Sequence, residues 1–342
     1  MNKLKDKRTE LSKIGKINTI EMLYEGTDYK SGQTIQVLSS QEDSIRTSHK
    51  MLLEGIDFDL TYTPLMHLGY KAVLASLGDL YAAFHQPEAI SINIGLSGKF
   101  YYEDIEKLWQ GVLAAAKQHG INSLILDLNS SLTGLCVSVI SVGKQRSEIL
   151  AGLNAPKEHD LICLSGDLGA AYMGLLVLER EKVAFNNSGN TPDKMKQPDL
   201  SAYKYILESY LSPYIKPDLI DLFISEGILP GYGYCLTKGL SAAIKELSRD
   251  SGLGARLYLE HIPISSKTIE AGEEFAIDAV TAAMNGGDDY KFIFTIPIEK
   301  HEEFRKEFQN WDVIGHLTKP GFGTILITPD GQNVEIKAQG WE

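Results

Sequence analysis

Cysteine is scarce in this chain of 342 residues, which contains only Cys136, Cys163 and Cys235. An odd number at wide spacing fits neither a disulfide framework nor a zinc-binding pattern. Cys136 and Cys163 stand in apolar runs, so we expect both in the core. Cysteine usage of this kind agrees with a reducing cytoplasm.

Long apolar runs and an excess of basic charge are also missing. No apolar run approaches the roughly 20 residues that span a bilayer, and the charged segment at residues 1–13 has no apolar stretch behind it, so no secretory signal is expected. Lys and Arg number 33 against 45 Asp and Glu, a net charge of -12. Clustered Lys and Arg bind nucleic acid and anionic membranes, so neither partner is expected, and we predict a cytoplasmic protein.

Strand and helix patterns alternate along the first half of the chain. Residues 64–84 have apolar residues at helical spacing behind an opening proline, and residues 102–119 form an amphipathic helical pattern. Residues 88–96 alternate as a half-buried strand, and ILDL and LTGLCVSVISVG are β-rich runs. A polar stretch near residues 146–160 predicts a boundary between two domains, residues 1–148 and residues 149–342.

The second half returns to the same alternation. A buried strand, DLICLS, is followed by GDLG and the helical run AAYMGLLVLEREK, and residues 185–199 are predicted to form a mobile loop. Helical patterns cover about 200–226 and 237–250, and the strands YKFIFTIP, WDVIGHL and GTILITP come last. The predicted fold class is therefore α/β with a mixed sheet in each half.

Three segments carry a resemblance to a known family: GDLGAAYMGLLVLEREK (166–182), MNGGDDYKFIFTIP (284–297) and the terminal QGWE (339–342). They resemble thiamine-monophosphate kinase, of the aminoimidazole-ribonucleotide synthetase-like superfamily, and the likeness continues in order over nearly the whole chain. The resemblance implies a two-domain fold of that type, a homodimer formed by the N-terminal domain and an ATP site near the dimer interface. It also implies transfer of a phosphoryl group from ATP to thiamine monophosphate, with Mg²⁺ neutralising the phosphates.

Several positions that are acidic in that family hold other residues in this chain. Mg²⁺ takes hard oxygen ligands, so its site requires converging carboxylates. The resemblance places other residues at those acidic positions, and an apolar residue where the family has a phosphate-contacting arginine. The replacements are Gln33, Thr34, Lys50, Cys235 and Lys238 for acids, Thr237 for a serine, Leu153 for the arginine, and Ile125 and Leu126 for two glycines.

Some positions still match. Asp79 and Asp127 are kept and are weak candidates for metal ligands. On the substrate side, the resemblance implies roles for Asp288, Asp289 and Trp341, while Asp57 stands where the family has a histidine. The candidates for binding nucleotide or phosphate are Lys50, Asp79, Asp127, Thr237, Lys238, Gly166 and Gly169.

The GDLG turn has two interpretations. It follows a buried strand and opens a helix, so its backbone N–H groups suit a phosphate. The alternative is a plain turn between strand and helix.

Three interpretations of the broken site stay open. Lys50 and Lys238 pair with Asp79 and Asp127 and close the old metal site, or they bind a small phosphorylated ligand directly without metal, or kinase activity survives. We predict that phosphoryl transfer is lost or much reduced. The alternatives are a regulatory partner protein and an enzyme of the same superfamily with a changed substrate.

Overall fold

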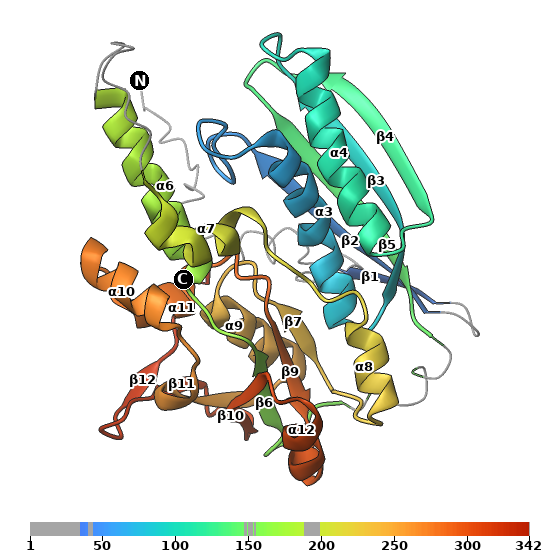
Figure 1. The fold of residues 1–342 in the computed structure, drawn as a ribbon. Coiled ribbons are helices and arrows are strands. Elements are labelled where there is room, and N and C mark those ends of the chain that lie inside the picture. Colours follow the sequence, from blue (N-terminus) through green and yellow to red (C-terminus); the bar gives the residue numbers. More distant parts are fainter. Residues whose placement is uncertain are drawn as a thin grey trace, which may run out of the picture.

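The computed structural model describes residues 35–39, 44–146, 149, 153, 155–187 and 199–341. Two mixed β-sheets, one from each half of the chain, form its frame, and helices lie between and around them (Figure 1). The α/β prediction is confirmed. Among the described residues, no helix is both long enough and apolar enough to cross a membrane.

The first sheet has the strand order β1-β2-β5-β3-β4 and carries two helices on one face (Figure 1). Alternate side chains of its central strands, such as Val139 and Ile92, are fully buried under these helices. The opposite face is open, and Met51 is 60% exposed there. The elements are β1 (Ile35–Ser39), β2 (Ser44–Leu53), α3 (Leu65–Ala82), β3 (Gln86–Leu96), α4 (Tyr102–Gln118), β4 (Ser123–Ser130) and β5 (Cys136–Lys144).

Two glycines let α3 and α4 pack at very short range. A Cβ atom at Gly69 would lie 2.0 Å from the carbonyl oxygen of Leu108, and one at Gly111 would lie 1.9 Å from that of Met66. Any larger residue would force the helices apart, because protein interiors leave no spare volume. Pro64 precedes the first residue of α3, where the fixed φ of proline suits a helix start.

The second sheet has the order β12-β11-β8-β10-β6-β9-β7. Helices α9 and α11 belong to the apolar cluster that covers one of its faces, with Leu247 and Ala283 among the buried residues. The elements are β6 (Leu161–Ser165), α6 (Ala170–Asn187), α7 (Lys204–Leu211), α8 (Leu219–Ser225), β7 (Gly233–Cys235), α9 (Leu240–Ser251), β8 (Gly254–Tyr258), α10 (Ser266–Phe275), α11 (Ala279–Asn285), β9 (Phe292–Ile296), α12 (His301–Glu307), β10 (Trp311–Thr318), β11 (Thr324–Ile327) and β12 (Asn333–Glu335).

One apolar core joins the two halves. Phe84 from the first half meets Phe223 and Phe294 from the second in edge-to-face contacts, each at 5.4 Å between ring centroids. Phe308 extends the cluster at 4.5 Å from Phe223. The predicted boundary at 148/149 therefore separates two sheets that share a continuous core.

Most predicted elements are found, with two corrections. The helical pattern over 200–226 is interrupted after α7, because Pro213 and Pro217 cannot continue a helix. Cys136 lies half-buried at the start of β5 on the open face of the first sheet, whereas Cys163 is fully buried as predicted. Of the predicted loop at 185–199, residues 188–198 lie outside the described part of the chain, and α6 extends into it as far as Asn187.

Candidate functional site

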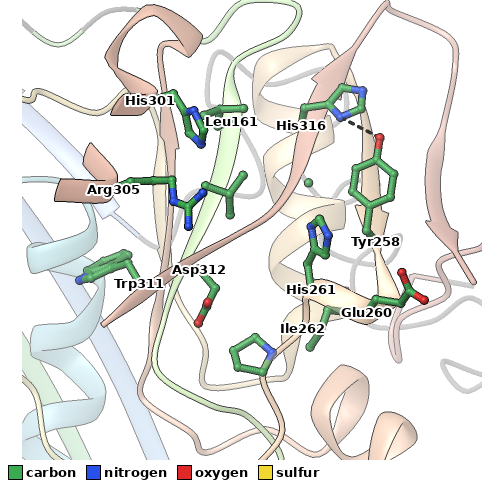
Figure 2. Close-up of a pocket in the computed structure, with 13 residues that line it drawn as sticks. Leu161, Tyr258, Glu260, His261, Ile262, His301, Arg305, Trp311, Asp312 and His316 are labelled. Carbon is green, nitrogen blue, oxygen red and sulfur yellow. Dashed lines mark hydrogen bonds between the residues drawn. The ribbon is translucent and has the colours of Figure 1, made fainter. Parts of the chain in front are cut away.

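Two large cavities mark the candidate sites. The larger, about 570 Å³, lies against β8 and β10 of the second sheet and is lined by none of the predicted site residues; we call it the outer cavity (Figure 2). The other, about 460 Å³, lies between the two halves and is lined by Asp57, Thr237 and Asp288. We call it the central cavity and treat it as the candidate functional site.

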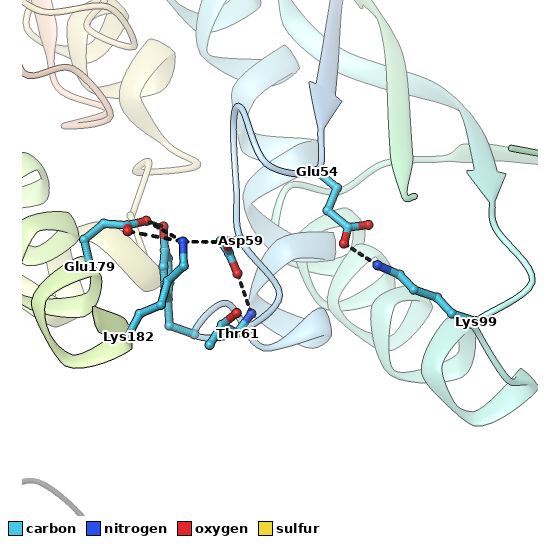
Figure 3. A network of polar contacts seen from close by, with 7 residues as sticks. Glu54, Asp59, Thr61, Lys99, Glu179 and Lys182 are labelled. Carbon is cyan, nitrogen blue, oxygen red and sulfur yellow. Dashed lines mark hydrogen bonds and ion pairs between the residues drawn. The ribbon is translucent and has the colours of Figure 1, made fainter. Parts of the chain in front are cut away.

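An ion pair and a hydrogen bond connect the two halves across one wall of the central cavity. Lys182 of α6 lies 2.9 Å from Asp59 of the first half and 3.2 Å from Glu179 (Figure 3). Tyr62 donates a hydrogen bond to Glu179 at 2.6 Å. Burial raises the pKa of Asp59, but hydrogen bonds from Lys182 and Thr61 outweigh it and hold that pKa at about 2. This wall is therefore charged at neutral pH.

Lys71 of α3 is the most buried cation of this cavity. Its ammonium lies 2.8 Å from Asp288, 3.9 Å from the centroid of the Tyr210 ring, and 3.3 Å from the Tyr210 carbonyl oxygen. Asp288 reaches Lys71 from a left-handed backbone conformation, φ 59°. The predicted substrate-side residue Asp288 is thus neutralised from the first half of the chain.

The remaining substrate-side candidates are placed differently. Asp57 lines the cavity and accepts a hydrogen bond from the Leu53 N–H at 2.8 Å. Trp341 does not line the cavity; its ring lies 5.2 Å from the Arg249 guanidinium at the end of α9. Gln339 lines the cavity two residues earlier.

Asp289 occupies the start of α6. It is almost fully buried and accepts the Gly169 N–H at 3.1 and 3.2 Å, and burial raises the pKa of its carboxyl to about 7. A Cβ atom at Gly169 would meet the backbone nitrogen of Ala283 at 2.9 Å. The protein's own carboxyl therefore sits where the GDLG turn was predicted to cradle a phosphate, which favours the alternative of a strand–helix turn for Gly166 and Gly169.

The predicted metal side is closed by an ion pair. The Lys50 ammonium lies 2.9 Å from Asp79 Oδ2, which also accepts the Ser48 hydroxyl at 3.1 Å. These side chains of Lys50 and Asp79 are only 19% and 13% exposed. Burial lowers the pKa of Lys50, but the charge and hydrogen bond of Asp79 outweigh this and raise it. Cys235 fills the neighbouring space against Gly78.

Asp127 lies apart from this pair, contrary to prediction. In the strand pairing Lys50 is aligned with Val139 and Ile92, so it lies on the face of the sheet that the helices cover. Asp127 is aligned with Asn93 and lies on the open face. Strands β2 and β4 are three spacings apart, about 14 Å. The Asp127 carboxylate accepts a hydrogen bond from Asn129 at 3.0 Å.

One of the three interpretations paired Lys238 with a retained aspartate, but the structure places Lys238 beside a glutamate instead. Its ammonium lies 3.9 Å from Glu246, and the side chain is 52% exposed. Burial raises the pKa of Glu246, and the charge of Lys238 opposes that shift. No pattern in the sequence marks Glu246 as the partner, because it lies in the middle of an ordinary amphipathic helix.

The residues at the predicted metal site do not fit Mg²⁺. Among the described residues, no three His, Cys, Asp or Glu side chains are grouped to hold a metal ion. Asp79 is occupied by Lys50, Asp127 lies on the other face of its sheet, and Leu153 packs against the main core. Gln33 and Thr34 lie outside the described residues.

Sequence reasoning missed Tyr62, Lys71, Glu179, Lys182 and Tyr210, which form most of the central cavity's polar wall. One feature of the sequence could have identified Lys71. It is a cation among the apolar residues of a helical run, and a lysine is rarely buried without a partner of opposite charge.

No family model matches the chain. It is 26% identical over 277 residues to the thiamine-monophosphate kinase of Buchnera aphidicola, covering 78% of this chain and 77% of the relative. It is 22% identical over 333 residues to that of Aquifex aeolicus, covering 97% and 99%. The solved structure described as AaThiL complexed with AMPPCP and TMP superposes with a TM-score of 0.81 at 21% identity, covering 98% and 99%.

The chain is a homologue of the thiamine-monophosphate kinases. The structural likeness extends to hydrogenase maturation proteins: the HypE–HypF complex matches with a TM-score of 0.66 at 15% identity, over 93% of this chain and 98% of that one. At that identity the second likeness concerns the fold.

Proposed function

We propose that this thiamine-monophosphate kinase homologue has lost most or all of its phosphoryl transfer and retains a site for a small phosphorylated ligand. The Lys50–Asp79 ion pair carries the proposal. Phosphoryl transfer rests on positioning and on cations that neutralise the phosphates. Here the Lys50 ammonium forms an ion pair with Asp79, the carboxylate that would bind the metal. Asp79 therefore does not have both of its oxygens available for a metal ion.

The central cavity supports ligand binding. It lies between the halves, combines the aromatic rings of Tyr62 and Tyr210 with charged groups of both signs, and has a volume within the range of ligand pockets. The solved structure named above is described as a complex with AMPPCP and TMP. We extend to this chain ATP as a candidate ligand, without Mg²⁺.

A homodimer completes the proposal, with residues 1–148 and 149–342 as two domains of a cytoplasmic protein. The open face of the first sheet exposes Met51 at 60%, Ile125 at 61% and Ile140 at 39%. Apolar groups gathered on one sheet face favour burial against a second copy of the same face.

Metal-free anion binding by Lys50 and Lys238 is the second candidate. Its support is the exposure of Lys238, whose side chain is 52% exposed with its ammonium 3.9 Å from Glu246. Lys50, held at 2.9 Å by a shielded carboxylate, favours the closed site.

Steady-state turnover of ATP and thiamine monophosphate with Mg²⁺ tests the proposed loss of catalysis. We expect ADP release no faster than with the Asp79→Asn variant, which removes the remaining acidic residue of the pair. Turnover at an ordinary kinase rate, roughly 1–100 per second, that falls in Asp79→Asn would contradict the proposal. A changed substrate would instead give turnover with another phosphate acceptor.

A further inference from the structure

The outer cavity lies outside the region to which the likeness to the kinases assigned functional residues. Its floor is the face of β8, β10 and β6 that lies opposite α9, and one side is formed by α12 (Figure 2). At Gly315 the floor has no side chain, beside an irregularity in the pairing of β10 with β6. A Cβ atom there would meet the Arg256 carbonyl oxygen at 2.0 Å, so glycine is required.

Aromatic rings form two walls of this cavity. On one wall, the Tyr258 ring lies 5.4 Å from that of His261 and 5.8 Å from that of His316. On the other wall stands Trp311, which the core rings fix in place, Phe223 at 5.6 Å and edge-to-face among them. Aromatic walls of this kind suit an aromatic ligand, whose ring can stack on them. The side chains of the walls are already held in place by their neighbours.

Three charged side chains line this cavity, and two of them, Arg305 and Asp312, lie between these walls (Figure 2). Arg305, Glu260 and Asp312 line the cavity, and none has an ion pair or hydrogen bond from its side chain within the described part of the chain. Figure 2 shows Arg305 and Asp312 between Trp311 and His261. The two acids and one base carry a net charge of -1. The histidines do not add a metal site, since the described residues hold no group of three suitable ligands.

We propose that the outer cavity binds a small aromatic zwitterion, with its ring between Tyr258 and Trp311, its carboxylate on Arg305 and its protonated amine on Asp312 or Glu260. An aromatic α-amino acid has this chemistry. A guanidinium binds a carboxylate through two parallel hydrogen bonds. The two carboxylates repel a multiply charged anion, so a nucleotide is disfavoured. The volume of about 570 Å³ is ample for an indole or phenol with its side chain.

A ligand series on the full chain tests the proposal. L-tryptophan and L-tyrosine are titrated by saturation-transfer NMR and calorimetry beside tryptamine, which lacks the carboxylate, and indole-3-propionate, which lacks the amine. We expect both amino acids to bind about tenfold more tightly than either truncated compound, the worth of one charge-assisted hydrogen bond.

Variants then locate the bound ligand. Arg305→Gln is expected to weaken L-tryptophan about tenfold and to leave tryptamine unchanged. Lys306→Gln is the matched control, because Lys306 is exposed on the same helix and pairs with Glu307 away from the cavity, and it should bind as the native protein does. Absence of saturation transfer from both amino acids, or equal affinity in Arg305→Gln and Lys306→Gln, would overturn the proposal.

Discussion

Lys50 is subject to two opposed effects at the residue scale. Burial disfavours its charge, and Asp79 at 2.9 Å favours it more strongly. Each member of such a pair makes the other tolerable, so removal of one leaves an uncompensated charge in a shielded place. The ion pair at the position where the resemblance implied a metal site therefore contributes to the stability of the chain.

Lys50→Ala is expected to lower the free energy of unfolding by about 2 kcal/mol, less than the 3–5 kcal/mol of a fully buried pair because both side chains keep some exposure. Urea denaturation measures the change. Lys267→Ala is the control, since Lys267 and Glu270 are more than half exposed and such pairs contribute roughly 0–1 kcal/mol. Equal small losses in both variants would show that the Lys50 pair is a surface contact.

Asp289 gives the chain a pH-dependent stability. Its folded pKa of about 7 lies above the unfolded value near 4, so the folded state binds more protons between these pH values. Stability from this group is full below pH 4 and falls as the pH rises to 7, by up to about 1.4 kcal/mol per pH unit. Thermal unfolding of the native chain and Asp289→Asn across that range should diverge, with the native chain losing more; parallel curves would contradict the assignment.

At the scale of elements, α3 and β7 meet at one very small residue. A Cβ atom at Gly78 would lie 2.5 Å from the sulfur and 3.0 Å from the Cβ atom of Cys235, which is buried. We expect Gly78→Ala to lower the free energy of unfolding by about 1–3 kcal/mol, the usual cost of overpacking.

The matched tests use the same measurement. Gly78→Ala should cost less in a Cys235→Ala background, where the sulfur at 2.5 Å is gone and only the Cβ atom at 3.0 Å remains, and Gly98→Ala, which meets nothing within 4 Å, should be nearly neutral. An unchanged cost in the Cys235→Ala background would mean that the strain arises elsewhere.

Periodicity predicted the elements whose own sequence determines them. Helix α3 followed from apolar spacing behind Pro64, and β6 and β9 followed from short buried runs. The interruption after α7 was also readable, since Pro213 and Pro217 forbid a continuous helix. Strand β8 and helices α10 and α11 were missed, because their short and mixed patterns become elements only when neighbouring strands and helices cover them.

At the scale of the whole molecule, the open sheet face should govern assembly. Ile125→Asp places a charge among the exposed apolar groups of that face and is expected to convert the proposed dimer to monomer, measured by light scattering coupled to size exclusion. Leu113→Asp is the control, because Leu113 is 45% exposed on α4, which covers the other face of this sheet. A native chain that is monomeric, or a dimer unchanged by Ile125→Asp, would contradict this assembly.

Contacts in the candidate site were predictable only for residues that the family motifs align securely. Lys50 and Asp79 were named together from the sequence, and the structure brings them into contact. The pairing of Lys71 with Asp288, 217 positions apart, and the occupation of the GDLG turn by Asp289 depend on how the two halves pack. The separation of Asp127 from Asp79 depends on the strand order, which puts β4 three strands from β2, and on the sheet register, which sets the face on which Asp127 lies.

Calorimetric titration of AMPPCP, with Mg²⁺ and with a chelator, tests the loss of the metal site most directly. Because Asp79 is paired with Lys50, we expect one of two results. Either Mg²⁺ leaves the affinity for AMPPCP unchanged, or AMPPCP does not bind in either buffer. Binding that Mg²⁺ strengthens about tenfold or more, about 1.4 kcal/mol, and that loses this strengthening in Asp79→Asn, would contradict the account.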